Sequence, residues 1–126
     1  MIALLQFRPD TVADQAQAGQ SREAQQFQEQ AEQALRLLAE RPGFVRGSVG
    51  RATDDAGCWL LATEWESVGA YRRALGGYQV KLLATPLLGQ ALDQPSAFEQ
   101  LLRIDSDGSE TATASDRAAD ADWTGR

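Results

Sequence analysis

The chain of 126 residues contains no histidine, one cysteine and a single lysine. Without histidine there is no imidazole base, no Ser-His or Cys-His nucleophile, no His-ligated zinc and no histidine ligand for haem. The lone Cys58 cannot form an internal disulfide, and its place at the start of an apolar run is typical of a small core residue. Proton transfer must therefore use carboxylates, Tyr, Lys, Arg, water or the substrate itself.

No glycine-rich loop follows an apolar strand-like run, so the chain lacks a phosphate-binding motif for flavin or nucleotides. Gly76 and Gly77 follow a helical pattern instead, where they indicate a helix C-cap. Together with the missing histidines, this predicts a protein that carries no metal, flavin or haem cofactor.

Positive charge is also scarce. Twelve Lys and Arg residues face eighteen Asp and Glu residues, for a formal net charge of -6. Binding to phosphate backbones requires a clustered excess of basic residues, so nucleic acid is not expected as a partner. No apolar run approaches the roughly 18 residues of a membrane span, and no basic leader precedes the first apolar segment. We therefore expect a cytoplasmic protein with no membrane contact, and the single cysteine fits a reducing compartment.

The acidic residues gather at the C-terminal end. Residues 105–126 hold six acids and two arginines, which accounts for four of the six net negative charges. This segment has few apolar side chains to offset the entropy of ordering. The sequence therefore predicts one domain over residues 1–104 and an acidic, disordered tail over residues 105–126.

Within residues 1–104 the apolar periodicity alternates between strand and helix. A long helix is predicted from residue 21 to Pro42, because Phe27, Ala31, Ala34, Leu35 and Leu38 fall on one helical face. The other expected elements are strands over residues 2–8, 44–51, 58–65 and 96–104, a helix over 68–75 capped by Ser67, and further helical turns over 78–84 and from Thr85 to about Leu92.

The resulting order, β-α-β-β-α-β, predicts an α+β fold of the ferredoxin-like kind with an antiparallel sheet. Both faces of its strands are apolar, since Ile2 and Leu4 alternate with Ala3 and Leu5. Helices cover only one face in this topology. A second copy of the sheet is the simplest cover for the other face, so we expect a homodimer.

Four local patterns identify a family. They are Arg41-Pro42-Gly43-Phe44 after the long helix, a strand ending in Gly50-Arg51, the Asp54-Asp55 turn, and Trp65-x-Ser67 followed by Ala70-Tyr71-Arg72. Over residues 1–104 this combination resembles the antibiotic biosynthesis monooxygenase family. The resemblance implies a dimeric α+β barrel and a cofactor-independent oxidation of an electron-rich aromatic, such as a phenol, anthrone or hydroquinone, by O2.

The same resemblance implies a site. Family members place a Trp at the end of the third strand and a Tyr six residues later at the border of a pocket, which makes Trp65 and Tyr71 the catalytic candidates; alternatively, both are core aromatics. An asparagine four residues before the Trp contacts the substrate in characterised members, and Leu61 occupies that position here. We expect Leu61, Phe44 and Arg72 to bind the substrate. The haem-degrading branch of the family uses a histidine that this chain lacks.

Charged residues offer further candidates. An arginine about 4 Å from a phenolate stabilises it by up to ~4 kcal/mol at an effective dielectric near 20, roughly three pKa units, so a cation could replace a histidine base. The arginines in question are Arg46, Arg51, Arg72 and Arg73; alternatively they are solvated surface charges. Glu64 and Glu66 flank Trp65 and are candidate bases, whereas Asp54 and Asp55 are typical of a hairpin turn.

Two functions remain open at this point. One is the oxygenase; the other is a non-catalytic dimeric barrel that binds a small molecule, or a polyketide cyclase or isomerase with the same fold, because a fold does not decide a function. Leu61 in place of the asparagine favours the second. A deep pocket bordered by Trp65 and Tyr71, with an arginine inside, would favour the first.

Overall fold

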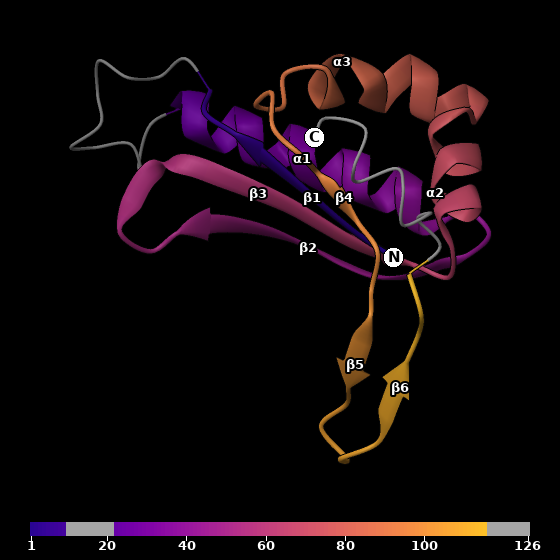
Figure 1. Cartoon of the computed structure of the whole chain (residues 1–126). Coiled ribbons are helices and arrows are strands. Elements are labelled where there is room, and N and C mark those ends of the chain that lie inside the picture. Colours follow the sequence, from indigo (N-terminus) through magenta and orange to yellow (C-terminus); the bar gives the residue numbers. More distant parts are fainter. Residues whose placement is uncertain (10–21, 116–126) are drawn as a thin grey trace, which may run out of the picture.

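A computed structural model describes residues 1–9 and 22–115 of the chain. Its elements are β1 (Ile2–Phe7), α1 (Arg22–Ala39), β2 (Phe44–Ala52), β3 (Asp55–Trp65), α2 (Val68–Leu75), the π-helix η2 (Val80–Ala84), α3 (Thr85–Leu88), β4 (Ala97–Phe98), β5 (Leu102–Ile104) and β6 (Glu110–Ala112). Four strands form an antiparallel sheet in the order β2-β3-β1-β4. The predicted α+β, ferredoxin-like class is confirmed (Figure 1).

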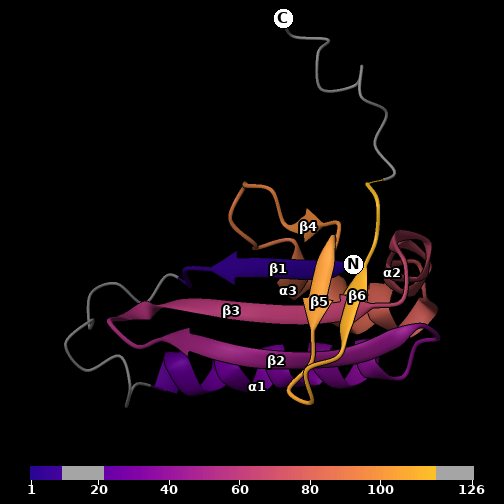
Figure 2. The same ribbon diagram turned by 60° about the horizontal axis from the view of Figure 1, so that its bottom comes forward.

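The helices lie on one face of the sheet, and the β5–β6 hairpin extends away from the other face (Figures 1 and 2). The helical face carries the core, to which α1 contributes the five buried residues Ala24, Phe27, Ala31, Ala34 and Leu38. Within the described residues, no helix combines the length and the apolar character needed to cross a membrane. The opposite face of the sheet, from here on the open face, is covered by no helix of the described chain.

A tight turn joins α1 to β2 and fixes the entrance to the later site. The Phe44 N–H donates to the Arg41 carbonyl at 3.3 Å, and the two residues between are Pro42 and Gly43, the pair that a type II turn favours. Gly43 has φ 89°, and a Cβ placed there would lie 2.5 Å from the Cβ of Ala70 on α2. The turn also accepts a hydrogen bond from the N–H of Glu66 at 2.8 Å. Glycine thus lets β2 start directly against the first turn of α2.

The last strand differs from the prediction. A single strand was expected over residues 96–104, but only Ala97–Phe98 pairs with β1, and the chain then leaves the sheet to form the two-stranded hairpin. The acids that suggested a tail build the hairpin's turn: the Gly108 N–H donates to the Asp105 carbonyl, and the Ser109 N–H donates to Asp107 Oδ1 at 2.9 Å. The boundary expected at residue 104 therefore lies inside a hairpin. Residues 116–126 of the expected tail lie outside the described residues, so a disordered tail stays a prediction.

The β2–β3 hairpin is longer than expected, because β3 begins at Asp55 rather than at Cys58. Asp55 accepts hydrogen bonds from the Gly57 N–H at 3.1 Å and from the Arg8 guanidinium at 2.6 Å. The contact with Arg8 lowers the pKa of this carboxyl below its ordinary value. Asp55 thus serves the hairpin, as the sequence predicted for the Asp54-Asp55 pair.

We predict that Gly43→Ala destabilises the fold by about 2–4 kcal/mol, through a side chain at positive φ and a clash with Ala70. Gly76→Ala is the matched control, since Gly76 has φ -86° and its new Cβ would meet only an ordinary contact at 3.5 Å. Chemical denaturation of both variants measures the difference. Equal midpoints for the two variants would contradict the proposed role of Gly43.

Candidate functional site

Three aromatic side chains from separate elements meet on the helical side of the sheet. The rings of Trp65 and Tyr71 lie 5.6 Å apart at 50°, and those of Phe44 and Trp65 lie 5.3 Å apart at 85°. These separations are typical of tilted and edge-to-face aromatic pairs. We refer to Phe44, Trp65 and Tyr71 as the aromatic cluster. The structure therefore brings together three of the predicted site residues.

A β-bulge places Phe44 in this cluster. Phe44 pairs with Trp65 and Arg46 pairs with Glu64, so Val45 is an extra residue in β2. In a regular strand Phe44 and Arg46 would share a face; the bulge turns Arg46 to the open face and leaves Phe44 beside Trp65.

Helix α2 delivers Tyr71 from the other side. Its N-cap is Ser67, whose Oγ accepts a hydrogen bond from the Ala70 N–H at 3.0 Å, so the helix starts three residues after Trp65. Tyr71 then follows the buried Ala70 and packs partly buried against the core. Strand end, cap and helix thus fix the Trp-Tyr spacing, as the sequence predicted.

Trp65 is almost completely buried, with 1% of its surface exposed. Its indole N–H donates to Thr63 Oγ1 at 2.8 Å, and Thr63 is itself buried. Leu61 lies two residues earlier on the same face of β3 and is also 1% exposed. The sequence analysis missed Thr63, although the period of two along the strand places it between Leu61 and Trp65. The indole N–H of Trp65 therefore already has an acceptor, which leaves only the ring to contact a ligand.

The phenol of Tyr71 is the one ionisable side chain in the aromatic cluster, and its pKa is shifted. Burial raises the pKa of its phenol above the ordinary value of 10. At neutral pH the group is protonated, so its O–H can donate a hydrogen bond to an anion.

The four candidate arginines occupy different places. Arg46 lies on the open face, where its Nε is 3.0 Å from Glu64. Arg51 stacks on Trp59 at 4.4 Å and donates to the Ala56 carbonyl at 2.6 Å; Trp59 is six residues from Trp65, about 20 Å along an extended strand. Arg72 and Arg73 are on the exposed side of α2. Arg72 thus follows Tyr71 directly in the sequence, but it is exposed to solvent.

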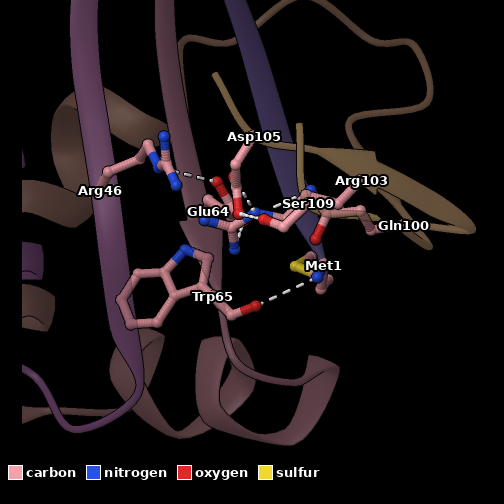
Figure 3. A network of polar contacts seen from close by, with 8 residues as sticks. All are labelled: Met1, Arg46, Glu64, Trp65, Gln100, Arg103, Asp105 and Ser109. Atoms are coloured by element: carbon pink, nitrogen blue, oxygen red, sulfur yellow. Dashed lines mark hydrogen bonds and ion pairs between the residues drawn. The ribbon is translucent and has the colours of Figure 1, made fainter. Parts of the chain in front are cut away.

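Glu64 belongs to a polar network on the open face (Figure 3). Its carboxylate, 13% exposed, accepts from Arg103 of β5 at 2.8 Å and from Gln100 at 3.3 Å, in addition to its ion pair with Arg46. Arg103 also contacts Asp105 at 2.9 Å, which lowers the pKa of that carboxyl. Glu64 therefore ties the hairpin to the sheet. The carboxylate that the sequence offered as a candidate base lies on the open face, on the opposite side of β3 from Trp65.

The larger cavity lies at the foot of the hairpin and has a volume of about 570 Å³. Trp65, Glu66 and Arg103 help to line it, together with the first turn of α2. A second, smaller hollow lies between α1 and β2, beside Leu35 and Gly47. Phe44, Leu61 and Tyr71 line neither of these two cavities. The aromatic cluster is thus packed side chain against side chain, and Trp65 alone links it to the larger cavity.

Comparison with known proteins identifies a family. Residues 15–82, more than half of the chain, match the antibiotic biosynthesis monooxygenase family. No curated protein matches the chain.

Solved structures share the fold at low sequence identity. SnoaB, a cofactor-independent oxygenase from Streptomyces nogalater, is 20% identical over 79% of this chain and 94% of that protein, with a TM-score of 0.57. Rv0793 from Mycobacterium tuberculosis is 14% identical over 94% and 96%, with a TM-score of 0.54. A conserved protein from Methanosarcina mazei is 18% identical over 76% and 82%, with a TM-score of 0.51. At these identities the likeness concerns the fold alone.

The raised pKa of Tyr71 predicts a loss of stability in alkali. A phenol that ionises less readily when folded leaves stability intact below pH 10, and stability falls as the pH rises above that value, by at most about 1.4 kcal/mol per pH unit. Denaturation midpoints at increasing pH measure this slope. Tyr71→Phe should flatten it, whereas the exposed Tyr78 should be replaceable by Phe without effect. A slope that Tyr71→Phe leaves unchanged would assign the loss to other groups.

Proposed function

The chain belongs to the antibiotic biosynthesis monooxygenase family, and we propose that it is a cofactor-independent monooxygenase that oxidises an electron-rich aromatic, a phenol, anthrone or hydroquinone, with O2. The observation that carries this proposal is the aromatic cluster, in which Trp65 and Tyr71 meet at 5.6 Å between the sheet and α2. Flat apolar rings beside one protonated phenol suit an aromatic substrate that must lose a proton.

The proposed reaction needs no electron carrier. The substrate anion gives one electron to O2, which forms a substrate radical and superoxide, and the two combine into a peroxide with a new C–O bond. Loss of water from this peroxide breaks the O–O bond and leaves a ketone. An anthrone CH2 group and one O2 thus become a C=O group and one H2O, which balances without an added reductant.

The chain's own residues have limited tasks in this scheme. Tyr71 donates a hydrogen bond to the oxygen on which negative charge develops, a contact of the kind that lowers barriers most when it is fixed in advance. Trp65, Phe44 and Leu61 form apolar walls that orient the ring and exclude water. We place Arg72 at the rim, where it attracts the anion, and Glu66, at the edge of the larger cavity, is the remaining candidate base.

Two observations favour the second function, a barrel that binds a small molecule without transforming it. Neither of the two cavities described above is bordered by both Trp65 and Tyr71. Leu61 stands where characterised family members have a substrate-contacting asparagine, and it is buried at 1% exposure. The Leu61 side chain can therefore pack against a ligand but cannot form a hydrogen bond with it.

We further propose that the protein works as a homodimer whose two open faces meet. The open face carries Ile2 and Leu4 of β1 and Leu60 and Ala62 of β3, all partly exposed. Burying this apolar surface against a second copy is favourable by roughly 25 cal/mol for each Å² removed from water.

For the activity, we predict that the purified protein accelerates O2 uptake with anthrones or naphthohydroquinones without added cofactor. Trp65→Phe and Tyr71→Phe should each lower the rate by roughly one to three powers of ten, as expected for a lost positioned contact. Trp59→Phe and Tyr78→Phe make the same substitutions away from the aromatic cluster and should leave the rate unchanged. Oxygen-electrode rates under identical conditions give the comparison.

Leu61→Asn separates the two functions. It restores the amide of characterised relatives at a cost of roughly 1–3 kcal/mol for a buried polar group, so the fold is checked by circular dichroism. A gain in rate with Asn, and none with Leu61→Ala, supports a shared pocket. If neither the parent nor a folded Leu61→Asn variant consumes these substrates, the binding barrel is the better reading.

For assembly, we predict a light-scattering mass near twice the chain's 13.7 kDa at micromolar concentration. A charge on the open face, as in Leu60→Asp, should shift the mass toward that of the monomer, because it would be buried unpaired. A monomeric parent chain would rule out the proposed dimer.

A further inference from the structure

The helical segment that follows α2 exposes large apolar side chains. Tyr78 is 79% exposed, Leu82 57% and Leu83 46%, and the three lie close together in the sequence. The same segment buries Val80 and Ala84, so other residues already make its contact with the core. Leucines on the solvent side add little to folding, and clustered apolar exposure of this kind is typical of a surface that binds a partner.

Pro86 gives this segment its shape. Because Pro86 has no N–H, the Leu82 carbonyl, four residues earlier, receives no α-helical hydrogen bond from it. The Thr85 N–H and hydroxyl both donate to the Val80 carbonyl, and the backbone widens into the π-helix η2. Such turns are rare and are frequent at functional sites. The two exposed leucines thus belong to a turn whose unusual shape the sequence specifies.

Cations without a partner accompany these apolar side chains. Arg72 and Arg73 are exposed in the last turn of α2, and Lys81 is exposed on η2. The Arg41 guanidinium reaches the chain between α2 and η2, where its Nε lies 3.3 Å from the place that a Cβ of Gly77 would take. In the part of the chain that the structure describes, these four cations form no ion pair. Other arginines each hold a carboxylate, namely Arg8, Arg36, Arg46 and Arg103.

The surface that these side chains form together is locally positive. The four cations, with Tyr78, Leu82 and Leu83, are from here on the α2–η2 surface. Residues 67–92 contain three basic residues and no Asp or Glu, although the whole chain has a formal net charge of -6. The acids next to the surface in the sequence are Glu40, Glu66 and Asp93, and among the described residues none of them pairs with its cations. The surface therefore carries uncompensated positive charge in a chain that is acidic overall.

We propose that the α2–η2 surface binds a partner protein that presents carboxylates around an apolar centre. Charge complementarity selects the acidic side chains, and Tyr78, Leu82 and Leu83 supply the apolar area that the contact buries. Salt screens charges beyond about 8–10 Å, so a local acidic patch meets the positive surface alone. An extended polyanion, such as nucleic acid or an anionic membrane, would also meet the acidic remainder of the chain.

This surface lies on the helical side of the sheet, away from the open face (Figure 1). A partner bound there would therefore not compete with the second copy proposed above. It would contact α2, the helix that carries Tyr71.

The probe for the test is a fluorescent synthetic peptide with leucines at helical spacing and glutamates at the other positions, and fluorescence anisotropy measures its binding to the full chain. Leu82→Gln with Leu83→Gln should weaken binding about tenfold or more, because apolar area is lost. Arg72→Gln with Arg73→Gln should weaken binding by a similar factor at low salt and remove most of its salt dependence. All four side chains are exposed, so the variants should fold, which circular dichroism checks.

Arg22→Gln with Arg36→Gln is the matched control, since it removes the same charge from exposed positions of α1. The control should stay within about twofold of the parent, because screening separates it from the α2–η2 surface. The same peptide with lysines in place of glutamates should not bind. Binding of both peptides, binding of neither, or an equal loss in the control and the α2 variant overturns the inference.

Two further outcomes would assign the surface to another occupant. Assemblies larger than the dimer that Leu82→Gln with Leu83→Gln dissolves would make it a contact between copies of this chain. Binding to phosphatidylserine vesicles, without binding to the acidic peptide, would make it a membrane contact. Either result overturns the acidic partner.

Discussion

The alternation of side chains along β3 is the constraint on which the rest of the structure depends. This central strand pairs with β1 on one side and β2 on the other, so its two faces become the two faces of the molecule. Trp59, Leu61, Thr63 and Trp65 are buried under the helices, while Leu60, Ala62 and Glu64 lie on the open face. A one-residue slip in its pairing would exchange the two sets. The proposed chemistry and the proposed assembly are thus assigned to opposite sides of one strand.

Glu64 and Trp65 are neighbours in the chain but lie on opposite faces of the sheet. Glu64 is tied to the β5–β6 hairpin through Arg103, and Trp65 packs on Tyr71 and Phe44. The bulge at Val45 extends the same separation to β2, because it sends Phe44 and Arg46 to opposite faces. Glu64, a candidate base by its position beside Trp65, therefore has its contacts on the open face of the sheet.

The sequence predicted the sheet, the long helix and the Trp65-Tyr71 pair because each rests on a local signal. Periodicity, the Ser67 cap and the Pro42-Gly43 turn act within a few residues of the chain. The β5–β6 hairpin was not predicted, because its acids resemble a disordered tail in composition, while in the structure Asp105 and Asp107 hold a turn. Periodicity also could not reveal the bulge at Val45, or the contact between Glu64 and Arg103, which lie 39 residues apart. Contacts of that range depend on the whole fold.

The packing of the aromatic cluster bears on how a substrate would enter. Trp65 is 1% exposed and reaches the larger cavity, whereas Tyr71 and Leu61 line neither of the cavities described above. A planar substrate that meets both rings must therefore separate α2 from the sheet end. The joint between them is made of the Ser67 cap, the Glu66–Gly43 hydrogen bond and the close approach of Gly43 to Ala70. Separating α2 there would also break the ring contact between Trp65 and Tyr71 and expose the buried Ala70 and Ala74. In an oxygenase of this design, access to the aromatic cluster would depend on the motion of one short helix.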